Sequence, residues 1–319
     1  MYWESPYISE GVWLRGNTHT HTTVSDGGHS PMETALLYGK VASTGRSPGM
    51  DYRFLVLTDH TIKTKPELFE IPQVEGLTVI EGLEYSYRGG SHIVGVGCPM
   101  VFDGPVEWYD YTRKDYQRFI DSINANGGMA ILAHPHWSRM DHWSAEDAIE
   151  LKGYTGIEVI SGDVFSGPSN LATDVWDAAL TSGHRVWCVG SDDFHSVRDF
   201  HNAWTFVYAR DNSKEAILEA LRHGSSYASN GASFGKLYTD DAWIIAECAD
   251  DSYYADCEKT FRFIGEGGVL RQTQVGKNPV AVYKGQGNEM YIRVELTLNW
   301  GYSAFSQPFF RKHPEQGEL

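Results

Sequence analysis

The chain has 319 residues, with 26 lysines and arginines against 42 aspartates and glutamates, which gives a net charge of −16 at pH 7. A chain this acidic lacks the cations that neutralise a phosphate backbone, so we exclude a nucleic acid as a stable partner. No stretch is apolar over the length needed to cross a bilayer, so we expect no membrane partner. The length predicts one large domain or two smaller ones.

The sequence also predicts a cytoplasmic location. The first residues, MYWESPYISEGVWLRG, lack the basic start and the apolar run of a signal peptide. The cysteines form no Cys-x-x-Cys pair, and Cys98 and Cys188 lie in apolar runs that favour buried thiols. Free buried thiols are typical of a reducing compartment.

From the amino terminus, the first elements alternate between strand and helix patterns. Residues 12–21 (VWLRGNTHTH) have strand character, and residues 30–43 (SPMETALLYGKVAS) form a predicted helix. Ser30 suits the N-cap of this helix, and Glu33 completes a capping box. The apolar run at 52–60 (YRFLVLTDH) is typical of a strand that is buried on both faces.

The alternation continues to about residue 224. We predict further strands at 77–87, 91–97, 129–136, 156–161, 185–195 and 203–209. We predict further helices at 112–128, 144–151, 169–183 and 213–224. Strands that alternate with helices are typical of a parallel α/β fold, either an open sheet or a closed barrel.

The pattern changes from about Gly235. Short β-type runs (AWIIAECA, KTFRFIGEGG, PVAVYKG and MYIRVELTLNW) follow one another, separated by turn residues and without a helical pattern. We therefore predict an α/β domain over residues 1–234 and a small appended β-rich domain over residues 235–319. The β-rich domain binds a ligand or mediates self-association into a homo-oligomer, and its residues do not distinguish these two roles.

Histidines and acids gather at the ends of the predicted strands. In a parallel α/β barrel the carboxyl ends share one face, so residues that are distant in sequence converge there. The groups at such ends are His19, His21, Asp59, His60, Glu84, His134, His136, Asp193 and His195. His92 is the exception, because it begins its strand. Side chains two apart on a strand point the same way, which makes His19 and His21 natural co-ligands and favours Asp193 over Asp192.

These groups have the chemistry of metal ligands. Neutral imidazoles and carboxylates bind zinc, manganese or iron. An isolated histidine at a strand end is usually only hydrogen-bonded, and the SDG sequence at 25–27 by itself predicts a turn. Several strands that all end in such groups are hard to explain by packing, so the joint pattern predicts a metal site. Nine groups exceed the needs of one ion, which predicts two or three divalent metal ions with a shared carboxylate.

Taken in order, the motifs resemble the PHP superfamily, named for polymerase and histidinol phosphatase. The matching segments, all within residues 12–235, are NTHTHTTVSDG, LTDH, EGLEYSYRGGSH, AHPHW and GSDDFH. The segment AWTFVYARDNSKEAILEALRHGSSYASNG is similar to the end of the subgroup that includes carbaryl-hydrolase-like enzymes. The resemblance implies an α/β fold, a distorted (βα)7-type PHP barrel with up to three metal ions at its carboxyl end.

The resemblance also implies which residues hold each ion. The ligands implied for a first ion are His19, His21, Glu84 and Asp193. Those implied for a second ion are Glu84, which is shared, His92 and His134. Those implied for a third ion are Asp26, His60 and His195. Asp26 stands at a position that is histidine in some members, and some members hold two ions, so both stoichiometries stay open.

Further residues near the motifs are candidates for catalysis and substrate binding. His136 protonates a leaving group, binds substrate or simply forms a hydrogen bond. Arg15, Arg139 and Arg198 are candidate phosphate clamps, although arginines near loops are usually solvated. Asp59 either orients a ligand histidine or faces solvent.

The sequence therefore predicts a metal-dependent hydrolase, a phosphoesterase that acts on a small phosphorylated molecule through a metal-bridging hydroxide. The same metals suit a hydrolase of carbamate, ester or amide bonds, an alternative that the subgroup likeness keeps open. A non-catalytic metal-binding module, as some polymerase-attached PHP domains are, is the third alternative. The full ligand set and the lack of a polymerase-like region disfavour it.

Overall fold

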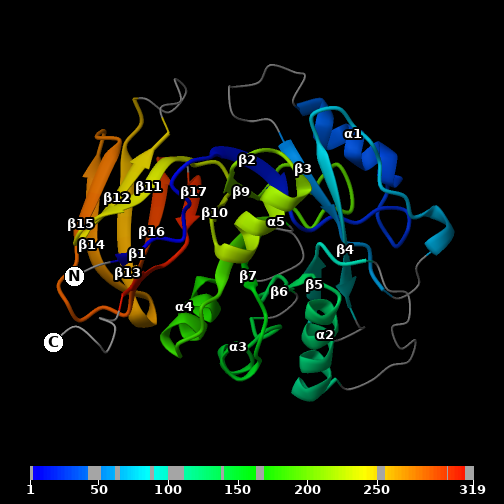
Figure 1. Ribbon diagram of the computed structural model, residues 1–319, viewed down its shortest axis with the longest axis horizontal. Helices are drawn as coiled ribbons and strands as arrows, with labels where there is room; N and C mark the ends of the chain where they lie inside the picture. The colour runs from blue at the N-terminus through cyan, green and yellow to red at the C-terminus, as the bar shows by residue number, and fades with distance from the viewer. Residues whose placement is uncertain are drawn as a thin grey trace.

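The structure is a computed structural model, and it describes residues 3–41, 52–61, 65–86, 90–99, 111–137, 140–162, 169–249, 256–299 and 301–312. Figure 1 shows a barrel with surrounding helices at one end of the molecule and a stack of long strands at the other end. This arrangement is the α/β barrel with a C-terminal β-rich part that the sequence predicts.

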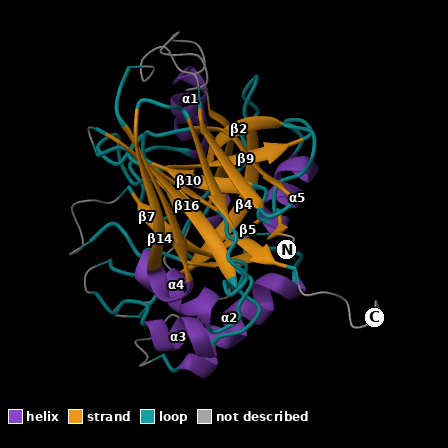
Figure 2. Ribbon diagram, turned by 90° about the vertical axis from the view of Figure 1, so that its left-hand side faces the viewer, coloured by secondary structure: helices purple, strands orange, loops and turns teal. Residues whose placement is uncertain are grey.

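The elements of the barrel follow the predicted order. The strands are β2 (Val12–Asn17), β3 (Tyr52–Leu57), β4 (Thr78–Tyr85), β5 (Ile93–Val96), β6 (Met129–Leu132), β7 (Gly156–Ser161) and β8 (Trp187–Ser191). The helices are α1 (Pro31–Val41), α2 (Arg113–Ala125), α3 (Ala145–Glu150), α4 (Thr173–Thr181) and α5 (Lys214–His223), with a 3-10 turn at Pro66–Leu68. Figure 2 shows α2, α3 and α4 gathered along one side of the strands. The last residues of the predicted helix 30–43 lie outside the described residues.

Local capping explains where two of these helices begin and end. Before α1, the Glu33 carboxylate accepts a hydrogen bond from Ser30 N at 2.8 Å, and Ser30 Oγ accepts one from Glu33 N at 3.3 Å. This is the capping box that the sequence predicts. α5 begins after Ser213 and ends at Gly224, whose φ of 73° is a left-handed conformation that glycine adopts without strain.

One strand runs against the others. β2, β3 and β4 pair in parallel, and so do β6, β7 and β8. β5 pairs antiparallel with both β4 and β6, so the predicted parallel arrangement is interrupted by an antiparallel strand here. The connection at 86–92 is too short for a parallel crossover, which needs a dozen or more residues. The reversal places His92, just before β5, at the same rim as the carboxyl ends of its neighbours, which explains the exception in the sequence pattern.

The residues that follow β2 lie beside those that follow β8. Thr20 and Phe194 form an isolated parallel bridge, and His21 N donates to Phe194 O at 2.8 Å. Two motifs that are far apart in sequence, THTH and DDFH, therefore lie side by side at the rim.

The C-terminal residues extend the same sheet. β9 (Trp204–Ala209) pairs with β2 and with β10 (Ser226–Ser229), and β10 pairs with β17 (Ser303–Ser306). The sheet continues through β16 (Tyr291–Leu298), β13 (Lys259–Gly265), β14 (Val269–Gly276), β18 (Phe309–Arg311) and the N-terminal β1 (Trp3–Glu4), and a 3-10 turn lies at Glu266–Gly268. A second sheet holds β11 (Phe234–Asp240), β12 (Trp243–Cys248) and β15 (Val280–Lys284). The predicted domain boundary after residue 234 lies at the start of β11. Several strands that follow this boundary belong to the same sheet as the strands of the barrel.

Gln307 ties this C-terminal part to the barrel. Its side-chain amide pairs with the backbone of Cys188 in β8, accepting from Cys188 N at 2.8 Å and donating to Cys188 O at 2.7 Å. The side chain is fully buried, and it also donates to Ser226 Oγ at 2.9 Å. One glutamine side chain therefore replaces a neighbouring strand along the open edge of β8.

We expect Gln307→Ala to lower the free energy of unfolding by about 1–3 kcal/mol, because it leaves buried backbone groups of Cys188 without partners. Urea denaturation followed by circular dichroism measures the change. Gln272→Ala is the matched control, because the exposed Gln272 amide donates to Val282 O at 2.8 Å on the surface. Its effect should stay within about 0.5 kcal/mol. Equal losses in the two variants would contradict the role of Gln307.

Two further expectations concern the whole chain. No helix in the described part of the chain is both long enough and apolar enough to cross a membrane. The cysteines at positions 98, 188, 248 and 257 are all buried and free, as the apolar runs around Cys98 and Cys188 predict.

Candidate metal centre

A cluster of histidines and acids lies at the rim where the strands of the barrel end. We call it the rim cluster; its members are His19, His21, Asp26, His60, Glu84, His92, His134, Asp193 and His195. The structure thus brings together all the predicted metal ligands. Two of them, His60 and His195, are partly exposed, Asp26 is exposed, and the rest are buried.

The deepest part of the rim cluster has the spacing of a metal site. His19 Nε2 and His21 Nε2 lie 3.0 Å apart, and Asp193 Oδ1 is 3.2 Å from each of them. Glu84 Oε1 lies 3.4 Å from His19 Nε2. Ligand atoms about 2.1 Å from a tetrahedral zinc ion are separated from one another by roughly 3.4 Å. The donor types and their spacing therefore fit a bound divalent metal ion.

Glu84 presents its two carboxylate oxygens to different histidines. Oε1 lies 3.0 Å from His92 Nδ1 and 3.3 Å from His134 Nε2. Oε2 lies 2.7 Å from His60 Nδ1 and 3.5 Å from His21 Nε2. A carboxylate between two sets of imidazoles is suited to bridging two metal ions.

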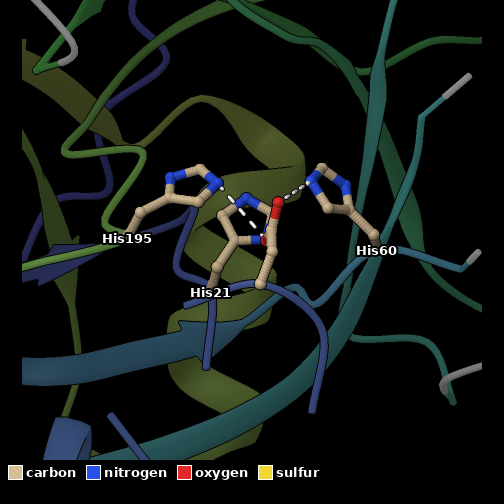
Figure 3. A group of neighbouring side chains, drawn as sticks. His21, His60 and His195 are labelled. Atoms are coloured by element: carbon tan, nitrogen blue, oxygen red, sulfur yellow. Dashed lines mark ion pairs between the residues drawn. The ribbon is translucent and has the colours of Figure 1, made fainter. Parts of the chain in front are cut away.

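The outer part of the rim cluster surrounds Asp26. Its carboxylate lies 3.3 Å from His60 Nε2, 3.5 Å from His195 Nε2 and 3.8 Å from His21 Nδ1. Figure 3 shows the rings of His21, His60 and His195 pointing toward one another. One ligand atom from each of these four residues lies within 4.8 Å of the others. His21 faces both parts of the rim cluster, because its second ring nitrogen belongs to the inner group.

The charges in the rim cluster keep several groups in the forms that bind cations. Burial opposes ionisation of Glu84 and Asp193, but the neighbouring histidines hold the pKa of both carboxyl groups well below the usual range. Burial lowers the pKa of His21 to about 3, and the nearby His195 and His60 contribute to the same shift. The His21 ring is therefore neutral at pH 7, with a lone pair for a metal ion.

His60 has the opposite shift. Burial lowers its pKa, but the carboxylates of Glu84 and Asp26 outweigh burial and raise the pKa to about 10. In the metal-free protein the His60 ring therefore carries an extra proton at pH 7. A metal ion that binds this ring must displace the proton, so metal binding at the outer part releases protons.

Two residues of the rim cluster have a strained backbone. His134 and Asp193 have φ angles of 32° and 48°, in the left-handed region that residues other than glycine rarely adopt. Asp193 Oδ1 is also buried without a hydrogen bond, although two ring nitrogens lie 3.2 Å away. Such strain and such unsatisfied groups concentrate at functional sites.

The two neighbouring acids in GSDDFH, Asp192 and Asp193, have different contacts. Asp193 faces the rim cluster, whereas Asp192 accepts hydrogen bonds from the Tyr38 hydroxyl at 2.7 Å and from Ala203 N at 3.0 Å. Burial raises the pKa of Asp192 to about 6. Asp193 is therefore the acid that lies in the rim cluster, as predicted, although both acids follow the end of β8.

Asp59 holds the loop that leads to Asp26. Its buried carboxylate accepts hydrogen bonds from Thr22 N at 2.7 Å, from Thr22 Oγ1 at 2.8 Å and from Ser25 Oγ at 2.7 Å. The Asp59 carboxylate does not face solvent, and its hydrogen bonds go to Thr22 and Ser25, not to a histidine of the rim cluster. Neither of the two roles that the sequence left open therefore applies. It fixes the turn between His21 and Asp26 instead.

We expect Asp59→Ala to weaken metal binding at the outer part of the rim cluster by about 10–100-fold, because Asp26 loses its support. The inner ligands should keep their metal. Metal stoichiometry after dialysis against a weak chelator measures the difference. Asp121→Ala, on the exposed face of α2, is the control and should retain all bound metal. Unchanged stoichiometry in Asp59→Ala would contradict the supporting role.

A cavity of about 270 Å³ opens onto the rim cluster. Besides residues of the rim cluster, Trp137, Arg198 and Asp199 line it. Arg198 is largely exposed, with its Nε 3.5 Å from Asp199 Oδ1. Of the arginines predicted to clamp a phosphate, Arg198 is thus placed at the cavity.

The other candidates lie elsewhere. Arg15 is buried, with its guanidinium 4.3 Å from the ring centroid of Tyr52 and 3.8 Å from that of Trp204. His136 Nε2 lies 2.8 Å from Asp174 Oδ1, and neither Arg15 nor His136 lines the cavity. Arg139 lies outside the described residues.

One buried acid beside the rim cluster was not predicted from the sequence. Glu158 lies in the middle of β7, and its carboxylate contacts His19 Nδ1 at 2.9 Å. The available signal was an acid inside the otherwise apolar strand GIEVIS, since carboxylates are almost never fully buried without partners.

Comparison with known proteins supports the fold. No protein-family model and no curated protein matches the sequence. The chain is similar in structure to a two-domain protein containing a predicted PHP-like metal-dependent phosphoesterase from Bacteroides vulgatus, with a TM-score of 0.50, 17% identity and 93% of each chain covered. It is also similar to PsfC from Pseudomonas syringae, with a TM-score of 0.46, 14% identity, and 67% of this chain and 90% of that chain covered. The likeness to the Bacteroides vulgatus protein over nearly the whole chain confirms the predicted barrel fold with an appended β-rich part.

Proposed function

We propose that the protein is a metal-dependent phosphoesterase that hydrolyses a small phosphorylated molecule in the cavity at the rim cluster. The observation that carries this proposal is the position of Glu84, whose two oxygens face separate sets of histidines within a convergent group of metal-binding side chains. The nearest alternative is hydrolysis of a carbamate, ester or amide with the same ligand set.

The charges of the site support metal ions as part of it. Glu84, Asp193 and Asp26 place three carboxylates beside the cavity, in a protein whose net charge is −16. Without cations this site repels a phosphate ester, whereas two or three divalent ions reverse the local field. Bound divalent ions also lower the pKa of water and polarise a phosphoryl oxygen.

The chain's own residues have separate roles in this proposal. His19, His21, Glu84 and Asp193 would hold one divalent ion in the deepest part of the rim cluster, and its other members would hold the rest. Arg198 at the cavity binds a phosphate oxygen of the substrate. His136 pairs with Asp174 away from the cavity, so we assign it no catalytic step.

We expect the purified protein to carry at least two equivalents of zinc, manganese or iron, and chelation to abolish its activity. Each of the three metals is then added back to the metal-free protein. Release of 4-nitrophenol from 4-nitrophenyl phosphate and bis-(4-nitrophenyl) phosphate is compared with release of 1-naphthol from a naphthyl carbamate.

Faster cleavage of either phosphate ester supports the proposal. Carbamate turnover without phosphate ester cleavage across a broad panel would favour the alternative hydrolase. Stoichiometric metal without turnover of any substrate would favour a non-catalytic metal-binding module. Full activity in metal-free protein would refute all three.

A further inference from the structure

Glu158 lies beside the rim cluster but is not one of its members. Its side chain lies in β7 and is 1% exposed, and its two oxygens accept hydrogen bonds from three groups. Oε1 accepts from His19 Nδ1 at 2.9 Å and from Ser191 Oγ at 2.7 Å. Oε2 accepts from the backbone His134 N at 2.9 Å.

The contact with Glu158 decides which nitrogen of His19 carries a proton. In the neutral form of the His19 ring, which is the form that binds a metal ion, a carboxylate oxygen that accepts from Nδ1 leaves the lone pair on Nε2. That Nε2 atom lies 3.0 Å from His21 Nε2 and 3.2 Å from Asp193 Oδ1, in the deepest part of the rim cluster. The hydrogen bond therefore aims the metal-binding nitrogen of His19 at the other inner ligands.

Glu158 also connects the ends of separate strands. His134 follows β6, and its backbone has the strained φ of 32°. The hydrogen bond from His134 N to Glu158 stabilises that conformation. Ser191 ends β8, two residues before Asp193. One buried carboxylate thus contacts the segments that carry ligands after β2, β6 and β8.

We propose that Glu158 is a positioning residue for the metal centre: it fixes the tautomer of His19 and the backbone of His134 so that both point their Nε2 atoms at bound metal. This inference rests on the proposed metal-dependent function. Partners of this kind, which hold the second nitrogen of a ligand histidine, typically change metal affinity by about 10–100-fold when they are removed.

Glu158→Gln tests the proposal with little change in volume. The amide has one acceptor oxygen and one donor group, so it cannot accept from all the donors that surround Glu158. If the oxygen stays with His134 N, the amide group faces His19 Nδ1 and moves the proton of that ring to Nε2, the nitrogen needed by the metal. Asp174→Asn is the matched control, because the Asp174 carboxylate contacts His136, which is not a predicted ligand.

Zinc affinities of the metal-free wild type, Glu158→Gln, Glu158→Asp, Ser191→Ala and Asp174→Asn are measured in competition with a chromophoric chelator. Absorption spectra of the cobalt-loaded proteins and urea unfolding of the metal-free proteins are recorded alongside. We expect Glu158→Gln to bind zinc at its tightest site about 10–100-fold more weakly and to have an altered cobalt spectrum. Glu158→Asp, whose shorter side chain withdraws from His19, should behave similarly. Ser191→Ala and Asp174→Asn should retain the wild-type affinity and spectrum.

Wild-type zinc affinity and cobalt spectrum in Glu158→Gln, in a protein that unfolds at the wild-type urea concentration, would overturn the proposal. An equal loss of affinity in Ser191→Ala would also overturn it, because that variant keeps the bond to His19. If Glu158→Gln does not fold, Glu158→Asp decides by the same criteria. A wild type that binds no zinc, manganese or iron would refute the proposed function itself, which is a separate result from wild-type binding that Glu158 does not influence.

Discussion

Glu84→Gln should remove about one equivalent or more of bound metal and lower turnover by at least about 10–100-fold. The substitution keeps the size of the side chain but replaces one anionic oxygen with an amide nitrogen that cannot bind a cation. Because one oxygen lies 3.0 Å from His92 Nδ1 and the other 2.7 Å from His60 Nδ1, its loss weakens both halves of the rim cluster at once. Metal analysis and turnover on the best phosphate ester measure the two effects.

His60→Ala provides the comparison. His60 contacts Asp26 in the outer part of the rim cluster, so we expect this variant to lose only the outer ion and to keep the inner ones. Glu81→Gln is the control for Glu84→Gln, because Glu81 lies on the same strand but forms an ion pair with Lys214 outside the rim cluster. It should retain its metal and its turnover. If Glu84→Gln lost one equivalent of metal and no more turnover than His60→Ala, the bridging role would be refuted and the metal site would stand.

Most of the predicted metal ligands could be found from the sequence because they lie at the ends of predicted strands, whereas His92 precedes its strand and Asp26 was implied only by the family resemblance. A buried strand such as FLVL needs no acid or histidine at its end for packing, so polar groups repeated at several strand ends indicate a shared site. Side-chain alternation then favoured Asp193 over Asp192, and the structure places Asp193 in the rim cluster and Asp192 outside it. The left-handed φ of 48° at Asp193, after the end of β8, was not predictable from this alternation.

The supporting residues could not be found in this way. The roles of Glu158 and Asp59 depend on which strands become neighbours and on how a loop folds back, and neither is a local property. Arg15 shows the converse error. It lies two residues from Asn17 in a motif strand, yet its guanidinium is buried between the rings of Tyr52 and Trp204 instead of reaching the cavity. Proximity in sequence to a motif does not determine the face from which a side chain leaves its strand.

The sequence pattern also could not predict how the β-rich residues pair and pack with the barrel. Turn spacing predicted a β-rich segment after residue 234 but not its pairing partners. In the structure β17 pairs with β10, and one hydrophobic core contains Tyr38 and Leu55 of the barrel together with Ile244 and Phe263 of the C-terminal strands. A shared core favours cooperative unfolding of the two parts, even if their folds can be distinguished.

A buried ion pair joins the two parts. Arg293 in β16 donates from Nε to Asp177 Oδ1 at 2.8 Å and from Nη2 to Asp177 Oδ2 at 2.7 Å. Asp177 lies in α4, which comes between β7 and β8 in the chain. Its carboxylate also accepts a hydrogen bond from the Tyr291 hydroxyl at 3.0 Å. Both charged side chains are almost fully buried. Arg293 also pairs with Glu295 at 2.6 Å, whereas Asp177 depends on Arg293 for its compensating charge.

We expect Arg293→Met to lower the free energy of unfolding by about 3–5 kcal/mol, because it leaves the Asp177 carboxylate buried without its cation. Replacing both partners, in Asp177→Leu with Arg293→Met, should recover part of this loss, since no buried carboxylate then remains at position 177, although Glu295 still loses its pairing with Arg293. Urea denaturation of all three proteins, followed by tryptophan fluorescence and by circular dichroism, measures the changes. Arg262→Met on the neighbouring β13, where Arg262 is only partly buried, is the control and should change stability by less than about 1 kcal/mol.

The same measurements test whether the barrel and the C-terminal strands unfold as one unit. If the ion pair couples them, the single variant should shift one common transition, with fluorescence and circular dichroism changing together. Metal binding should shift the same transition to a higher urea concentration, because the predicted ligands after β8 and Asp177 in α4 then unfold as one cooperative unit. Two separate transitions, with only one of them sensitive to Arg293→Met and the other to metal, would show that the predicted domains at 1–234 and 235–319 are independent and that the ion pair stabilises only a contact between them.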